Sequence, residues 1–206
     1  MSAVATLRTI DPAGLHPRDS YRLLISLVVP RPVAWVSTLG ADGTPNLAPY
    51  SFFNAVAGAP PTVMISVSQR MGQPKDTLRN IRETGEFVVN LAGESLAQAL
   101  NLTSSEVPYE VDEFALAGLE SLPSVVVRPP RVAAAPAALE VRATQIVPVL
   151  DSRYTLVLGQ VVLVHVRDDL LRPNGLVDAS RLRPLLRLGG DEFARLGEVF
   201  EMPRPG

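Results

Sequence analysis

The stretch Arg31–Ser68, "RPVAWVSTLGADGTPNLAPYSFFNAVAGAPPTVMISVS", decides the fold. Its first run, VAWVSTL, is rich in β-branched and apolar residues, and the GADG segment that follows is typical of a turn. An extended run from Thr44 to Ala57 comes next, and Pro61–Ser68 then has strand composition again. This spacing predicts a β-hairpin followed by a third strand.

Further strands are predicted on the C-terminal side of this stretch. They are Glu86–Leu91, the alternating run Ala138–Val149, and the long apolar run from Tyr154, in which Gly159 indicates a bulge or a close backbone approach. Short helices are expected at Tyr21–Val28, Asp76–Gly85 and Leu96–Asn101, and another from Asp191 towards the C-terminus. At least six strands with few helices predict a mostly β barrel.

Length and composition exclude several classes of protein. The 206 residues predict a single domain over 1–206, and a net charge of −2 without a basic patch makes nucleic acid an unexpected partner. The chain has no cysteine and two histidines, so we expect no thiolate nucleophile and no metal site. The N-terminus lacks a basic start followed by a long apolar run, and no segment has the length of a membrane span. We therefore expect a cytoplasmic protein.

Lys75, in "GQPKDTLRNI", is the only lysine among 19 Lys and Arg residues. It lies just before a predicted helix, whose first N–H groups lack partners and carry partial positive charge. Together with the Thr77 hydroxyl group, these N–H groups and the ammonium can hold a phosphate. Asp76 competes for the same N–H groups. The alternative is chance in an arginine-rich chain, beside an ordinary helix capped by Asp76 or Thr77.

The stretch "NLAPYSFFN", Asn46–Asn54, is a second candidate site. Neighbouring residues in a strand point to opposite faces, so one of Phe52 and Phe53 can enter the core while the other faces a pocket. The stretch can thus form the floor of a site for a flat aromatic ligand, or it is a plain core strand with a polar edge. Trp35 is expected in the core, and His165 is expected to be structural.

These stretches together resemble the flavin reductase-like proteins with an FMN-binding split barrel. The matching pieces are Arg31–Ser68, Lys75–Leu91, the LGQVVLVHV run and Leu185–Pro205, in the same order. The resemblance implies a Greek-key split β-barrel that forms a homodimer, with FMN bound near the subunit interface. It also implies an FMN-dependent oxidoreductase that passes electrons from NAD(P)H to a small acceptor or a partner monooxygenase. The alternative is a non-catalytic protein that stores or senses FMN.

The resemblance also assigns site residues. The phosphate end falls on Lys75, Asp76 and Thr77, and extends to Ser51 and Asn54. The isoalloxazine ring would lie along two strands, with the contacts Val36, Ser37, Thr38, Pro49, Tyr50, Ser51, Phe52 and Phe53. Neither a catalytic side chain nor a metal ligand is assigned, because the cofactor supplies the chemistry.

Two features at the other end of the site follow from the same resemblance. The segment Arg187–Phe193 resembles one that can close over the site. Tyr154 stands where many NADH-using members carry a histidine, and a tyrosine side chain is not cationic near neutral pH. This departure puts efficient NADH use in question and leaves FMN binding intact.

Overall fold

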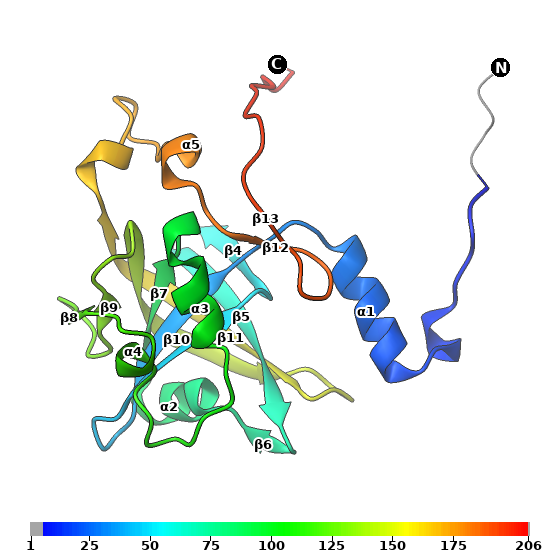
Figure 1. Ribbon diagram of the computed structural model, residues 1–206, viewed down its shortest axis with the longest axis horizontal. Coiled ribbons are helices and arrows are strands. Elements are labelled where there is room, and N and C mark those ends of the chain that lie inside the picture. Colours follow the sequence, from blue (N-terminus) through cyan, green and yellow to red (C-terminus); the bar gives the residue numbers. More distant parts are fainter. Residues whose placement is uncertain (1–5, 206) are drawn as a thin grey trace.

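The computed structural model describes residues 6–205, and its centre is an antiparallel sheet curled into a barrel (Figure 1). The strands of the sheet run in the order β3-β2-β7-β10-β11-β5-β4, and β6 pairs with β5 off this path. Their bounds are β2 (Ala34–Leu39), β3 (Pro45–Tyr50), β4 (Phe53–Gly58), β5 (Pro61–Arg70), β6 (Gln73–Pro74), β7 (Glu86–Leu91), β10 (Ala137–Pro148) and β11 (Tyr154–Val166). The prediction of a mostly β barrel is confirmed.

Short elements surround this barrel. The helices are α1 (Pro17–Leu27), α2 (Asp76–Thr84), α3 (Ala97–Leu102), α4 (Glu113–Leu116) and α5 (Ala179–Leu182), with 3-10 turns at Pro12–Gly14, Glu94–Leu96 and Asp168–Leu170. There are also two small sheets. In one, β12 (Leu186–Arg187) pairs with β1 (Arg31–Pro32) on one side and with β13 (Phe193–Ala194) on the other, and in the second β8 (Ser121–Leu122) pairs with β9 (Arg131–Val132). None of the helices in residues 6–205 is long and apolar enough to cross a membrane.

Strand β2 contributes to two cores because its successive side chains point to opposite faces. Val36 packs inside the barrel with Phe87 and Val141. Trp35 points the other way, into a cluster that includes Leu100 of α3 and Phe114 of α4, and its Nε1–H donates to Thr103 Oγ1 at 2.8 Å. The prediction that Trp35 lies in the core is confirmed. Burial on both faces explains why the first part of this strand, Ala34–Val36, is apolar at every position.

Gly159 of β11 lies close to β10 and to the ring of Phe87. A Cβ atom there would collide with Val141 Cγ1 and would lie 3.0 Å from the ring of Phe87. Opposite Gly159, the β10–β11 register shifts between Ala143 and Gln145. The glycine therefore serves the close approach that its place in an apolar run predicts, and β11 continues through it unbroken.

Two predictions of secondary structure are wrong. The run Thr44–Ala57 forms two strands, because the chain turns at Ser51 and Phe52 and sends β3 and β4 to opposite edges of the sheet. The helix expected from Asp191 is absent from the described residues. Gly190, at φ 53°, instead forms a turn in which Leu188 N–H donates to the carbonyl oxygen of Glu192, and β12 pairs with β13 across it.

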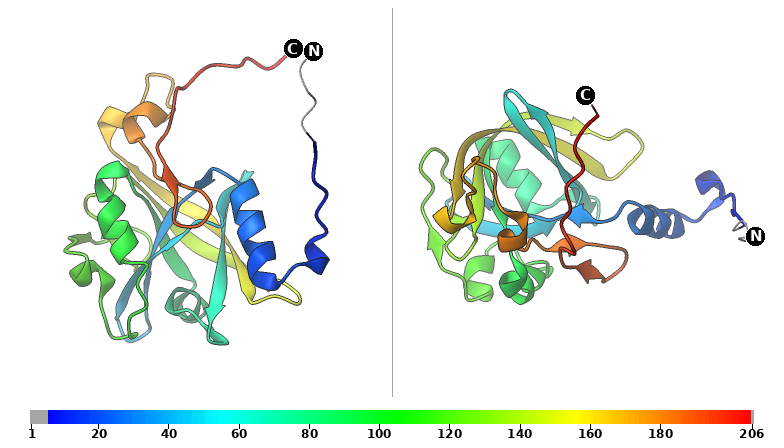
Figure 2. Two further views of the ribbon diagram at one scale, coloured as in Figure 1. Left: turned by 45° about the vertical axis from the view of Figure 1, so that its right-hand side comes forward. Right: turned by 90° about the horizontal axis from the view of Figure 1, so that it is seen from above.

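Helix α1 stands away from the barrel (Figure 2). Ile25 is its one buried residue, and the connection to the barrel passes through the buried guanidinium of Arg31. This group donates to the carbonyl oxygens of Ile25 (2.6 Å), Val28 (2.5 Å) and Leu188 (2.7 Å). One planar side chain with a fixed fork of donors thus joins the end of α1 to the segment that follows β12.

Glu140, fully buried on β10, fixes the loop before β9. Its carboxylate accepts hydrogen bonds from the N–H groups of Val125 (2.7 Å), Val126 (2.6 Å) and Val127 (3.0 Å), and His165 Nε2 lies 2.6 Å from Oε1. Burial alone would raise the pKa of Glu140, but the hydrogen bonds from His165 and the three N–H groups lower it to about 2. His165 therefore has a structural partner.

Candidate functional site

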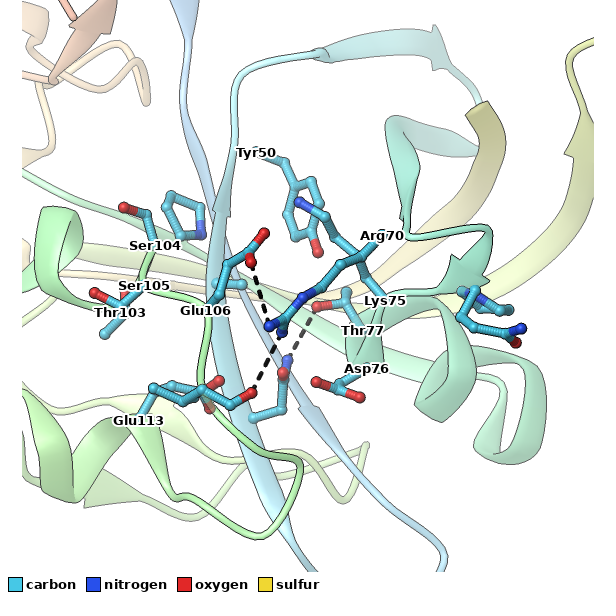
Figure 3. Close-up of a pocket in the computed structure, with 16 residues that line it drawn as sticks. Tyr50, Arg70, Lys75, Asp76, Thr77, Thr103, Ser104, Ser105, Glu106 and Glu113 are labelled. Carbon is cyan, nitrogen blue, oxygen red and sulfur yellow. Dashed lines mark hydrogen bonds and ion pairs between the residues drawn. The ribbon is translucent and has the colours of Figure 1, made fainter. Parts of the chain in front are cut away.

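A cavity of about 220 Å³ lies where the start of α2 meets β3 and the loop after α3 (Figure 3). Its walls come from three segments that are distant in the sequence. The lining residues are Asn46, Ala48, Pro49, Tyr50, Arg70, Gln73, Pro74, Lys75, Asp76, Thr77, Thr103, Ser104, Ser105, Glu106, Val107 and Glu113. Hydroxyl groups and charged groups dominate this set, so the cavity suits a polar ligand.

The first turn of α2 forms one wall of the cavity. Lys75 occupies the N-cap position with extended backbone, and no side chain of the described residues caps the helix. The prediction that Asp76 or Thr77 caps α2 is wrong, because both lie inside the helix. The N–H groups at such an end lack intrahelical partners and attract anions.

Two cations reach this cavity. The Lys75 side chain extends beside the ring of Tyr50, and Arg70 enters from the end of β5 (Figure 3). Arg70 forms an ion pair with Glu106 at 3.2 Å, and both of these side chains are exposed. Exposed pairs contribute little stability, so an incoming anion can compete with Glu106 for the guanidinium.

Thr77 is buried and takes part in a network of amides and hydroxyl groups beneath the cavity. Asn46 Nδ2 donates to Thr77 Oγ1 at 3.0 Å and to Thr38 Oγ1 at 3.1 Å. Asn80 Nδ2, from the next turn of α2, also donates to Thr38 Oγ1 at 3.0 Å. Thr38 thus ties β2, β3 and α2 together, and the network holds the start of α2 in place.

Tyr50 and Glu113, two titratable side chains at the cavity, have raised pKa values. Burial raises the pKa of the Tyr50 hydroxyl group, a hydrogen bond with Thr77 opposes this, and the charges of Asp76 and Glu113 add to the rise. Burial also raises the pKa of Glu113 to about 6, although its Oε2 accepts a hydrogen bond from Leu47 N–H at 3.0 Å. Tyr50 therefore stays protonated over the physiological range.

The structure divides the predicted site residues into three groups. Pro49, Tyr50, Lys75, Asp76 and Thr77 line the cavity. A second group, Val36, Ser37 and Thr38, lies in the interior on β2, between β3 and β7.

The buried hydroxyl groups of this second group have partners inside the protein. Ser37 Oγ donates to the carbonyl oxygen of Pro130, and Thr38 accepts from Asn46 and Asn80. Direct contact of this group with a bound ring stays a prediction.

The third group lies at the turn after β3 and the start of β4. Ser51 Oγ is 3.5 Å from Arg31 Nε, and Phe53 and Asn54 begin β4. Phe52 stacks on Tyr154, with ring centroids 5.7 Å apart and planes at 22°. Tyr21 of α1 lies 6.5 Å from Phe52. An aromatic cluster of Tyr21, Phe52 and Tyr154 therefore borders this turn.

Several residues that line the cavity are not predicted from the sequence. Asn46 lies in the stretch Asn46–Asn54, but its inward direction depends on the β2–β3 register, which pairs it with Thr38. Thr103, Ser104 and Ser105 form a run of hydroxyl residues, which was a usable signal. Glu113 carries no local signal, because its place at the cavity depends on how α4 packs against β3.

The comparison with known proteins agrees with this geometry. The family model for the flavin reductase like domain matches residues 26–186. The structure of nitrilotriacetate monooxygenase component B from Bacillus cereus is 38% identical, with a TM-score of 0.93 and coverage of 97% of this chain and 100% of that chain. That of 2-nitrobenzoate 2-nitroreductase from Pseudomonas fluorescens is 32% identical, with a TM-score of 0.87 and coverage of 96% of each chain.

A relative without an assigned function is similar over nearly its whole length. An uncharacterised protein of Halalkalibacterium halodurans is 39% identical over 201 residues, which are 95% of this chain and 96% of the relative. The family model covers most of the chain, and the barrel is that of the split-barrel flavin reductases. The chain therefore belongs to the flavin reductase-like family, whose members bind flavin.

Proposed function

We propose that the protein is an FMN-dependent oxidoreductase of the cytoplasm, which passes electrons from NAD(P)H to a small acceptor or a partner monooxygenase. The observation that carries the proposal is the polar cavity at the start of α2, in a chain of the flavin reductase-like family. Bound flavin supplies the redox chemistry, so the protein has to position it and does not need a reactive side chain of its own.

The residues present at the cavity fit the phosphate of FMN. Lys75 and Arg70 supply positive charge, the first turn of α2 supplies N–H groups, and Ser105 supplies a hydroxyl group, whereas Ser104 Oγ donates to the carbonyl oxygen of Asn101. Hydrogen bonds between charged partners are shorter and stronger than those between neutral partners. The cavity therefore distinguishes FMN from riboflavin, which lacks the phosphate.

The aromatic cluster supports the placement of the flavin ring near Phe52. Tyr50 lines the cavity and Phe52 belongs to the cluster, so the two sites lie at opposite ends of the short segment Tyr50–Phe52. The bacterial relatives named monooxygenase component B and nitroreductase are consistent with electron transfer to different acceptors. We therefore propose the physiological acceptor as a class, a small molecule or a partner monooxygenase.

A second candidate function is FMN binding without nicotinamide oxidation. Tyr154 favours it, because the resemblance places a histidine there in many NADH-using members, whereas here a neutral ring stacks on Phe52. The two candidates agree on the cofactor and differ in whether a reduced nicotinamide reacts at the site.

The proposal is tested by the absorbance spectrum of the purified full-length protein. We expect it to retain FMN or to quench the fluorescence of added FMN on titration. Anaerobic mixing with NADH, and separately with NADPH, is expected to bleach the flavin absorbance rapidly. Bound flavin that is not bleached by either nicotinamide would establish the second candidate, and an absence of flavin binding would contradict both.

We also propose a homodimer, with α1 as part of its interface. Leu24, Leu27 and Val28 are 52%, 71% and 53% exposed, a concentration of apolar surface that soluble monomers rarely leave uncovered. Tyr21 joins this surface to the aromatic cluster. The flavin ring would then lie close to the second subunit, as the family resemblance implies.

Charging this surface is expected to separate the subunits. The double variant Leu24→Glu, Leu27→Glu should shift the mass in sedimentation equilibrium from a dimer to a monomer, because it places two carboxylates in an apolar interface. Arg18→Glu, in the first turn of the same helix, serves as the matched control. A dimer that survives the double substitution would place the interface elsewhere.

A further inference from the structure

The Tyr50 hydroxyl group points into the cavity, which the sequence around Tyr50 does not predict. Tyr50 is 8% exposed, yet it lines the cavity, and its hydroxyl group points towards Thr77 at the start of α2 (Figure 3). The Thr77 side chain is the neighbour of this hydroxyl group in that direction, and it lowers the pKa of Tyr50 against the effect of burial. A phenol that is more than nine-tenths buried, with its polar end at a cavity, is suited to bind a ligand there.

The network beneath the cavity favours one direction of donation between these two groups. Asn46 Nδ2 donates to Thr77 Oγ1, so the Thr77 oxygen already accepts a hydrogen bond. This bond occupies one of the two lone pairs of the Thr77 oxygen and leaves its proton for another partner, and the oxygen of Tyr50 lies on that side. A hydroxyl group has one proton and can accept as well, so Tyr50 keeps its own proton for a partner in the cavity.

Thr38 holds this arrangement from below. Its Oγ1 accepts from Asn46 at 3.1 Å and from Asn80 at 3.0 Å, and Thr38, Asn46 and Asn80 are all buried. Because the Asn46 amide is shared between Thr38 and Thr77, loss of the Thr38 hydroxyl group frees the amide to turn away from Thr77. The direction of the last hydrogen bond therefore depends on a residue that does not touch the cavity.

We propose that the Tyr50 hydroxyl group donates a hydrogen bond to the flavin phosphate, and that Thr38, Asn46 and Thr77 are positioning residues that fix its direction. The inference rests on the proposed function, because it takes the phosphate to lie in the cavity. It changes three of the expected roles: Tyr50 serves the phosphate instead of the ring, Thr77 acts through Tyr50, and Thr38 positions these groups from below. The raised pKa of Tyr50 agrees with this role, since a protonated phenol is a donor and a phenolate would repel the phosphate.

The first test compares FMN and riboflavin titrations of the Tyr50→Phe variant. The substitution removes a hydrogen bond to a charged group and keeps the ring, so FMN binding should weaken about tenfold and riboflavin binding should stay within about twofold. Tyr109→Phe is the matched control. The Tyr109 hydroxyl group lies 3.3 Å from Asn80 Oδ1, in contact with the same network, but Tyr109 is not among the described residues that line the cavity.

The second test addresses positioning. Thr77→Val and Thr38→Val should each reduce the preference for FMN over riboflavin, and Thr77→Ser, which keeps the hydroxyl group, should retain it. Adding Thr38→Val to Tyr50→Phe should cause little further loss, because residues in one network are not additive. If the losses of FMN affinity in the two single variants add up in the double variant, the positioning role is overturned. The Thr77 and Thr38 variants test this role even if Tyr50→Phe folds poorly.

The outcomes separate this inference from the proposed function. If the wild-type protein binds neither flavin, the proposed function fails and the inference fails with it. If the wild-type protein prefers FMN but Tyr50→Phe weakens both ligands equally, Tyr50 packs on the ring and the inference alone is overturned. Unchanged binding in Tyr50→Phe overturns it as well.

Discussion

The Lys75→Ala variant is expected to bind FMN ten- to hundredfold more weakly than the wild-type protein and to bind riboflavin with unchanged affinity. Lys75 is the N-cap residue of α2, and its ammonium lies at the cavity beside Tyr50 (Figure 3). A hydrogen bond to a charged group contributes about 1.5–3 kcal/mol, which corresponds to the expected range of affinities. Fluorescence titration with both flavins measures the difference directly.

Two further variants sharpen this result. Arg82→Ala removes a positive charge from the last turn of the same helix, on an exposed side chain, and should change neither affinity. Lys75→Arg keeps the charge and exchanges a compact ammonium for a planar fork, so it should recover part of the FMN affinity. Equal losses of FMN and riboflavin in Lys75→Ala would mean that the ammonium does not contact the phosphate.

The Glu140→Ala variant is expected to lose about 3–5 kcal/mol of the free energy of unfolding. The substitution leaves the N–H groups of Val125, Val126 and Val127 without their acceptor, and it removes the partner of His165. Buried donors without partners are costly. Urea denaturation followed by circular dichroism measures the change.

A matched substitution separates this effect from a general loss of carboxylates. Glu83→Ala removes an exposed carboxylate whose Arg79 partner lies 3.4 Å away, so stability should change by no more than about 0.5 kcal/mol. A similar loss in both variants would show that the loop contacts of Glu140 do not stabilise the fold.

Glu140 also gives the stability of the wild-type protein a defined dependence on pH. Its pKa in the folded protein is about 2, below the ordinary value of 4.5, so the unfolded chain binds the proton more tightly. The stabilisation is therefore complete above about pH 4.5 and is lost as the pH falls towards 2. In Glu140→Ala the decline over this interval should be shallower.

The barrel could be predicted from the sequence because its strands carry their own signals. Pro61–Ser68 and Glu86–Leu91 became strands within two residues of the expected ends, and Gly159 marked a close approach that the structure contains. The C-terminal helix failed as a prediction because the Gly189–Gly190 turn allows a hairpin. Pairing with β12 then stabilises an alternative that local helix propensity does not anticipate.

The candidate site was predictable only in part, for a physical reason. Lys75 and the start of α2 are local features, and they line the cavity, where phosphate binding stays a prediction. Thr38 lies eight residues from Asn46 along the chain, but their hydrogen bond depends on the register of β2 against β3. The hydroxyl run Thr103–Ser105 is visible in the sequence, but its place at the cavity depends on tertiary packing.

The position of the cavity in the sequence matters for chimaeras made from this chain and a relative. All of its walls lie between Asn46 and Glu113, whereas the aromatic cluster takes Tyr154 from β11, beyond that interval. A chimaera with a crossover after Glu113 would inherit every cavity wall from one parent and Tyr154 from the other. Such a library would separate the contribution of the cavity from that of Tyr154, because the two would come from different parents.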